Sequence, residues 1–243
     1  MRLSRLRVPY LLICLAALVG CQSVNPLMRL DTVIVDLSKS RLYQQEATEN
    51  GLMAYASKWT DQAANGDILE VVFFSEANPY GYKQVCLYQM VLFPPAFKYR
   101  EKTKKELTAK LKAAYDAAKW TENTPILEIL SRLGENHGSS PNLSWHLVII
   151  SDLMQSSKKL TLSSQYLSRS SDAMVVEKMS SLSLAPKFPP ETIDVYYFPG
   201  LVNKNTAIET LEYRKVLSIF RNFLGSWASA AQVKFTNLEE VQR

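Results

Sequence analysis

Short apolar runs along the chain alternate with longer stretches of helical periodicity. Apolar runs rich in β-branched residues predict strands over residues 32–36, 68–74 and 146–150. The first is expected to be fully buried, and the third also to be buried. Weaker strand patterns cover residues 84–93, 193–198 and 233–235. Pro94-Pro95 closes the first of these weaker patterns, because proline cannot donate to a strand ladder.

Apolar residues at helical spacing predict helices over residues 42–64, 102–119, 124–133 and 206–230. The serine-rich stretch 155–190 gives no clear pattern. Strands and helices alternate with no repeat and no wide linker. We therefore expect a single α/β domain, built on a doubly wound, mostly parallel, Rossmann-like sheet flanked by helices.

The N-terminus has the pattern of an export signal. Three arginines precede an apolar run from Val8 to Val19, which matches a signal-peptide core and is too short to span a bilayer. The sequence Leu18-Val19-Gly20-Cys21 resembles the bacterial lipobox, in which lipid is attached to the cysteine thiol. We expect a signal peptide over 1–20, a short lipidated tether over 21–29 and the folded domain over 30–243.

The resemblance to bacterial lipoproteins also implies a location. Gln22 follows the cysteine where aspartate is the usual mark for inner-membrane retention, so the outer membrane, on its periplasmic side, is favoured. The alternative is an ordinary signal peptide with an incidental cysteine at position 21.

Composition narrows the function further. Hydrophobic residues make up 47% of the 243 positions and charged residues 21%, as in globular proteins. The formal charge of +5 owes three units to the arginines of the signal segment, so no basic footprint for nucleic acid is expected. Two histidines and three cysteines are too few for a usual zinc site. Cys86 lies in an apolar alternation and is expected to be buried.

Candidate chemistry lies where the first strand ends, in Asp36-Leu37-Ser38-Lys39-Ser40. Ligands of such sheets sit beyond the carboxyl ends of the strands. This D-x-S-x-S sequence resembles the start of the metal-ion-dependent adhesion site in the von Willebrand factor A family. Thr124, before a predicted helix, and Asp152, after a later strand, stand where that family has its other two pieces.

The resemblance implies a site for Mg²⁺ or Mn²⁺. Mg²⁺ prefers six oxygen ligands and keeps several waters. Ser38 and Ser40 would be direct ligands, Thr124 a third hydroxyl, and Asp36 and Asp152 would hold metal-bound waters. Such an ion stays electrophilic and accepts a carboxylate from a protein partner, which is how the family binds proteins.

Each piece of this motif also has a structural interpretation. Asp36, Ser38 and Ser40 could satisfy backbone amides of the following helix, and Thr124 could be an N-cap with Pro125 at the first helical position. Asp152 could be a turn residue. The loop before Thr124 also lacks the glycines common in the family, and Lys39 brings a cation next to the proposed ion.

Other chemistry finds little support in the sequence. There is no G-x-S-x-G motif and no phosphate-binding glycine loop, and Ser38 replaces the second aspartate of an aspartyl phosphatase. His146 is expected to be packed and hydrogen-bonded, and His137 to lie in an exposed loop. Tyr80, Tyr82 and Phe97 could form a contact surface, although packing or loop anchoring is favoured.

The sequence therefore predicts a non-enzymatic, membrane-anchored lipoprotein of the bacterial envelope that binds a protein partner through a metal site. A structural component of a secretion or transfer assembly, with a vestigial metal site, is the alternative. A metal-assisted hydrolase comes third, because it needs a base that the sequence does not offer.

Overall fold

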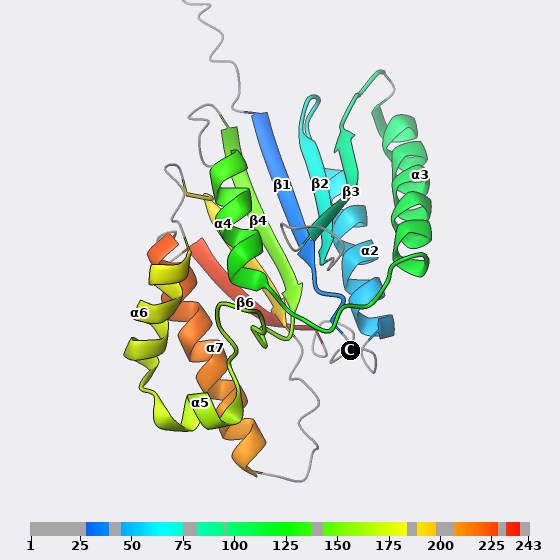
Figure 1. The fold of residues 1–243 in the computed structure, drawn as a ribbon. Helices are drawn as coiled ribbons and strands as arrows, with labels where there is room; N and C mark the ends of the chain where they lie inside the picture. Colours follow the sequence, from blue (N-terminus) through cyan, green and yellow to red (C-terminus); the bar gives the residue numbers. More distant parts are fainter. Residues whose placement is uncertain are drawn as a thin grey trace, which may run out of the picture.

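A computed structural model describes residues 28–38, 45–74, 82–94, 96–137, 143–183, 189–197, 207–227 and 232–238. Its strands form one sheet in the order β3-β2-β1-β4-β5-β6 (Figure 1). Neighbouring strands are parallel except β2 and β3. The strands are β1 (Met28–Val35), β2 (Ile68–Phe74), β3 (Tyr82–Gln89), β4 (Leu143–Ser151), β5 (Thr192–Tyr197) and β6 (Val233–Asn237).

Helices cover both faces of this sheet. On one face lie α2 (Gln45–Gln62) and α3 (Ala96–Asp116). The opposite face carries α4 (Ile126–His137), α5 (Ser164–Arg169), α6 (Asp172–Leu182) and α7 (Ala207–Trp227). This single domain, with a mixed, mostly parallel sheet between helices, confirms the predicted fold class.

Strand pleating creates the two cores. Leu30 and Ile34 of β1 pack under α4 and α7, whereas Val33 and Val35 of the same strand pack under α2 and α3. The central strands are thus buried on both faces, which explains why each is a nearly continuous apolar run in the sequence.

The serine-rich segment that gave no pattern contains two helices. The hydroxyl of Ser163 accepts a hydrogen bond from the Tyr166 backbone at the start of α5, and Ser171 does the same for Met174 at the start of α6. These serines are N-caps, which satisfy backbone donors that a helix start leaves without partners. Both helices are short, so neither produces a long periodic pattern.

Cys86 is buried, and His146 is packed with its Nδ1 2.7 Å from the Thr192 hydroxyl, as predicted. The expectation for His137 is wrong: it is the last residue of α4 and its Nε2 lies 2.7 Å from Glu70. Phe97 is 65% exposed at the start of α3, so it does not anchor the loop by burial.

The targeting predictions concern a part of the chain outside the described residues. Cys21 and the predicted signal peptide precede Met28, where β1 begins. Within the described ranges, no helix has the length and apolar character to cross a bilayer.

Candidate functional site

Asp36 directly follows β1 at the carboxyl edge of the sheet. Its backbone N–H donates to the carbonyl of Ile150 in β4 at 2.9 Å, and its side chain is fully buried. Asp36 Oδ1 accepts the Ser38 N–H at 2.8 Å, and Oδ2 accepts the Ser151 hydroxyl at 2.7 Å. The carboxylate is therefore fixed between the ends of β1 and β4.

Asp152 follows β4 at the same edge and is also buried, with Oδ1 accepting the Met154 N–H at 2.9 Å. The next residue, Leu153, has a φ of 63°, which is unusual for a residue with a side chain. Such a conformation costs on the order of 1–3 kcal/mol and persists only where the surroundings impose it. Here the Leu153 N–H donates to the Ser151 hydroxyl at 2.9 Å, and the Leu153 side chain is fully buried.

Ser151 is the link between the two aspartates that sequence reasoning missed. Its hydroxyl donates to Asp36 and accepts from Leu153, so one side chain sets both the Asp36 carboxylate and the turn after Asp152. In the sequence, a serine at the end of an apolar strand does not indicate this role. Its position beside Asp152 does place it at the predicted site.

Ser38, two residues after Asp36, and Thr124, from a third loop, lie at the same edge. Ser38 is buried and pairs with Thr121, whose N–H donates to the Leu37 carbonyl at 2.8 Å. Thr124 is buried and exchanges two backbone hydrogen bonds with Ser156, at 2.9 and 3.0 Å. The segments 36–38, 121–124 and 151–156, which we call the site segments, are thus joined by hydrogen bonds. Ser40 lies outside the described residues.

The capping interpretation of Thr124 does not fit the helix that follows. The first carbonyl of α4 to accept a helical hydrogen bond is that of Pro125, from Ile129 at 3.1 Å, so the helix begins one residue later than an N-cap at Thr124 requires. Within the described chain the Thr124 hydroxyl makes no hydrogen bond. Thr124 is 3% exposed at this edge of the sheet.

Gln155 supplies the cap instead. Its Oε1 accepts the Leu127 N–H at 3.1 Å, and its Nε2 donates to Glu128 at 3.3 Å and to Ser157 at 3.1 Å. The side chain is 1% exposed, so this amide is a buried bridge between the segment after β4 and the start of α4. Nothing in the sequence marked it, because a lone glutamine in a serine-rich stretch has no distinctive spacing.

The donor set fits a hard cation. In the described ranges, no three residues among His, Cys, Asp and Glu come together as a metal site, so a carboxylate–imidazole site of that kind is not formed there. The site segments offer the oxygens of Asp36, Asp152, Ser38 and Thr124, and oxygen is the ligand type that Mg²⁺ and Mn²⁺ prefer. The two Asp36 oxygens accept the Ser38 N–H and the Ser151 hydroxyl, which holds the carboxylate at this edge of the sheet.

A cavity of about 680 Å³ adjoins the site segments. Its wall includes Leu37, which precedes Ser38 in the chain, and Thr121, which pairs with Ser38. Trp120 also lines the cavity. Lys83 and Lys119 also line it. The cavity thus combines apolar walls with two cationic side chains.

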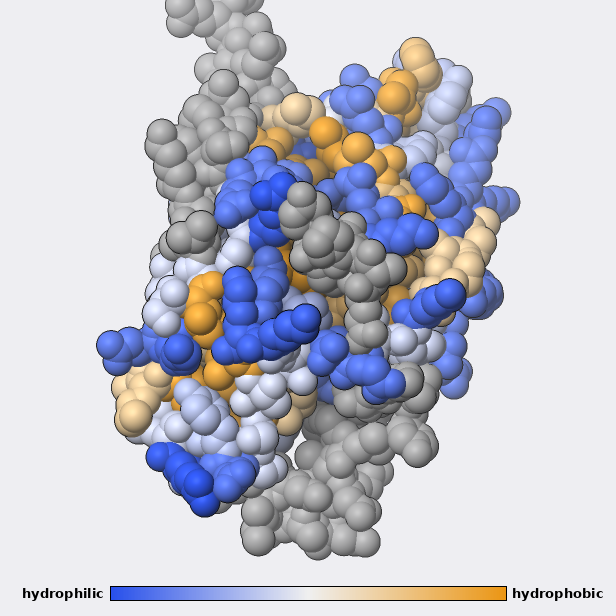
Figure 2. All heavy atoms as spheres, in the orientation of Figure 1, coloured by the Kyte–Doolittle hydropathy of each residue, from blue (hydrophilic) through white to orange (hydrophobic). Residues whose placement is uncertain are grey.

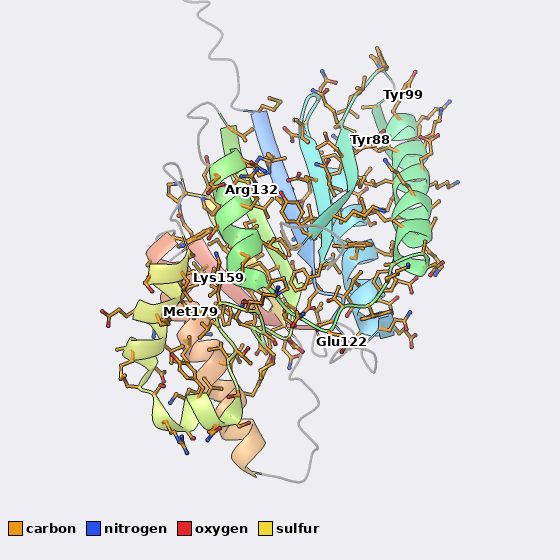
Figure 3. All side chains as sticks on the ribbon, in the orientation of Figure 1. Tyr88, Tyr99, Glu122, Arg132, Lys159 and Met179 are labelled. Atoms are coloured by element: carbon orange, nitrogen blue, oxygen red, sulfur yellow. The ribbon has the colours of Figure 1, made fainter. Side chains whose placement is uncertain are left out.

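Figure 3 shows Glu122 at this lower edge of the sheet, and Arg132 farther along α4, toward the end where β1 begins.

No protein-family model and no curated protein sequence matches this chain, but solved structures do. The pilus adhesin SpaC from Lactobacillus rhamnosus GG has a TM-score of 0.51 at 10% identity, over 88% of this chain and 29% of the adhesin. A von Willebrand factor type A structure from Catenulispora acidiphila gives 0.44 at 15% identity, over 88% of this chain and 41% of that one. An aerotolerance-related membrane protein from Bacteroides fragilis gives 0.40 at 12% identity, over 88% and 94%.

The chain spans less than half the length of the first two of these proteins. At 10% identity, the likeness to the pilus adhesin shows a shared fold alone. The sheet order and its two helical layers are the α/β architecture expected from the sequence.

Proposed function

We propose that this chain is a lipid-anchored protein of the bacterial envelope that binds a protein partner through a divalent metal ion. The observation that carries the proposal is the joining of three loops at one sheet edge, where they bury Asp36 and Asp152 beside two hydroxyl residues. Burying two carboxylates so close to one edge is unfavourable unless positive charge or donors compensate.

In this proposal, the hydroxyl residues and the aspartates have different roles at the metal ion. Ser38 and Thr124, with Ser40 of the same motif, would offer neutral hydroxyls to Mg²⁺ or Mn²⁺. Asp36 and Asp152 would accept hydrogen bonds from metal-bound waters. The bound ion would supply an electrophilic position for a carboxylate of the partner. Lys83 and Lys119 in the adjoining cavity favour an acidic partner surface, because opposite charges steer the approach of two proteins.

The role is binding, not catalysis, in this proposal. The shared fold with a protein named as a pilus adhesin supports a binding role. The anchor is proposed from the sequence Leu18-Val19-Gly20-Cys21, and the outer membrane from Gln22. Partners would then be proteins of the envelope, and nucleic acid is not among them.

One observation favours a second candidate, a scaffold of an envelope assembly with a vestigial site. Asp36 already takes hydrogen bonds from Ser38 and Ser151, and Asp152 from Met154. These contacts stabilise the edge of the sheet without any ion. Partner binding that ignores metal would establish the scaffold and exclude the metal-dependent module.

A pull-down from native membranes tests the proposal. The full chain is used as bait with millimolar Mg²⁺ or with chelator, alongside the Asp152→Asn variant. The matched control is Asp61→Asn, the same substitution at an exposed position at the end of α2, away from the site segments. We expect a partner that is lost with chelator and with Asp152→Asn, and retained by Asp61→Asn.

A further inference from the structure

The end of the domain away from Asp36 and Asp152 exposes apolar side chains. Four of them follow β3 and open α3, and we call them the turn patch: Val91, Phe93, Phe97 and Tyr99, exposed by 49%, 55%, 65% and 39%. The rings of Phe93 and Tyr99 lie 5.4 Å apart, so the patch is continuous at least there. Figure 2 shows apolar surface gathered at this upper end, and Figure 3 places Tyr99 there. Contiguous apolar surface that stays exposed on a folded domain is typical of sites that bind a protein or a membrane.

The folded domain also begins at this end. In the sheet, Leu30 of β1 pairs with Ile68, which pairs with Gln89 at the end of β3. Met28 lies two residues beyond that row, and the turn patch follows Gln89 on the same side of it (Figure 1). Two strand spacings separate β1 from β3, which is about 10 Å. Met28 is itself 42% exposed.

The proposed lipid anchor lies only seven residues before Met28, at Cys21. Seven residues span at most ~25 Å even when fully extended. A lipid on Cys21 would therefore hold the turn patch close to the bilayer surface. The site segments lie at the far end of β1, an eight-residue strand about 26 Å long.

The charge around the turn patch suits an anionic lipid surface. From Val91 to Lys105 the chain has five basic residues and one acidic residue, Glu101. Arg100 is committed to the carbonyls of Thr60 and Ala63, and Lys104 contacts Asp61. Lys102 pairs with Glu106, one turn further along α3, at 3.7 Å, and both side chains are exposed. Lys98 and Lys105 are also exposed, so the local balance stays positive with Glu106 included. Aromatic rings beside lysines are typical of surfaces that rest at the headgroup level of a membrane.

We propose that the turn patch docks onto the lipid bilayer that holds the chain's own anchor, and so points the site segments away from the membrane. The inference rests on the proposed anchor at Cys21 and is independent of the metal. One acyl-bearing residue gives attachment but no fixed orientation. A second contact through Phe93 and Phe97 would fix which end faces a partner.

The test places a polarity-sensitive fluorophore at Phe97→Cys in the full, lipidated chain. Cys86 is buried, and Cys21 would carry the lipid, so the introduced thiol is the reactive one. The labelled protein is reconstituted into vesicles of phosphatidylcholine with a quarter phosphatidylglycerol. The matched control is Met174→Cys on α6, an apolar position 60% exposed. We expect blue-shifted emission that spin-labelled lipids quench at position 97, and neither effect at position 174.

The outcomes separate the anchor from the docking. Protein that floats with the vesicles while position 97 keeps the emission of an aqueous probe would overturn the docking and leave the anchor intact. Protein that carries no lipid and does not float would refute the anchor, and the docking with it. Emission that shifts with protein concentration in the absence of vesicles would assign the turn patch to a second copy of this chain, against the proposal.

Discussion

Glu70 Oε2 lies 2.7 Å from His137 Nε2, so that the carboxylate of β2 meets the last residue of α4. The Thr32 hydroxyl donates to the same oxygen at 3.2 Å, and the Gln84 amide donates to the other oxygen at 2.6 Å. The acid is buried beneath α4, among apolar side chains of the core. This cluster ties the far end of α4 to the sheet, opposite the site segments.

The Glu70 cluster should make stability depend on acid. Burial by itself raises the pKa of Glu70, but the contacts with His137 and the hydrogen bonds from Gln84 and Thr32 outweigh it, so the pKa lies below the usual 4.5. A carboxyl with a lowered pKa contributes stability that is fully present above the unfolded value and is lost as pH falls through the folded one. Urea unfolding should therefore show a decline in the free energy of unfolding below about pH 4.5.

Glu70→Gln should lower the free energy of unfolding by about 1–3 kcal/mol at neutral pH, because buried donors lose their charged acceptor. It should also flatten the decline below pH 4.5. The control is Glu191→Gln, the same substitution where the side chain is 51% exposed. Equal acid profiles for wild type and Glu70→Gln would contradict the assignment of this stability to Glu70.

The elements that the sequence predicted best are those whose pattern follows directly from burial. The strand over residues 68–74 is found with those bounds, because both of its faces are covered and every position is apolar or paired. The first strand begins at Met28, earlier than predicted, because Arg29 and Asp31 interrupt its apolar pattern. These two side chains form an ion pair at 2.8 Å. The pair lets two charged residues lie in a strand from which the hydrophobic pattern alone would exclude them.

In the candidate site, the residues that could be predicted from the sequence are those that directly follow a strand. Asp36 and Asp152 are visible because each follows an apolar run, and parallel strands bring such residues to one edge. Gln155 and Ser151 were not predictable, since their contacts span 28 and 115 residues of sequence. The exposure of Phe97 was equally hidden, because a phenylalanine in sequence is more often core than surface.

The buried bridge at Gln155 should be important for stability. Gln155→Ala removes the acceptor of the Leu127 N–H and the donor to Glu128, which leaves both ends of the bridge without their partner. We expect a loss of about 2–3 kcal/mol in the free energy of unfolding. Gln165→Ala, at an exposed position in α5, should stay within about 0.5 kcal/mol of wild type. Urea unfolding at neutral pH measures both, and similar losses in the two variants would show that Gln155 is not a bridge.

The anchor is tested by chemistry at a single residue. Cys21→Ser should abolish labelling by palmitate and leave an unprocessed precursor, because the serine cannot carry the thioether-linked lipid. Cys86→Ser serves as the control, since that thiol is buried in the folded domain. Metabolic labelling followed by gel electrophoresis measures both changes. Label retained by Cys21→Ser would place the lipid elsewhere, and an unlabelled wild type would reduce the segment to a plain signal peptide.

The metal ion should stabilise the native protein in a way that depends on Asp152. A ligand that binds the native state alone adds RT ln(1 + [L]/Kd), so Mg²⁺ or Mn²⁺ at about 100 Kd should add ~2.7 kcal/mol. Asp152→Asn keeps an oxygen acceptor for the Met154 N–H and removes the charge. Without metal it should melt at or slightly above the wild-type temperature, because repulsion between Asp36 and Asp152 falls. With metal it should lose most of the gain.

Thermal melts of wild type, Asp152→Asn and Asp61→Asn, each with chelator and with either ion, distinguish metal binding by Asp152 from a purely structural role in the turn. If Asp152 acts only as a turn residue, the wild type ignores both ions, and Asp152→Ala costs about 0.5–2 kcal/mol through the lost Met154 hydrogen bond. That result would leave the fold unchanged but remove the metal from the interaction. The buried aspartates would then serve the scaffold function, with Asp36 held by Ser151 and Ser38, and Asp152 by Met154.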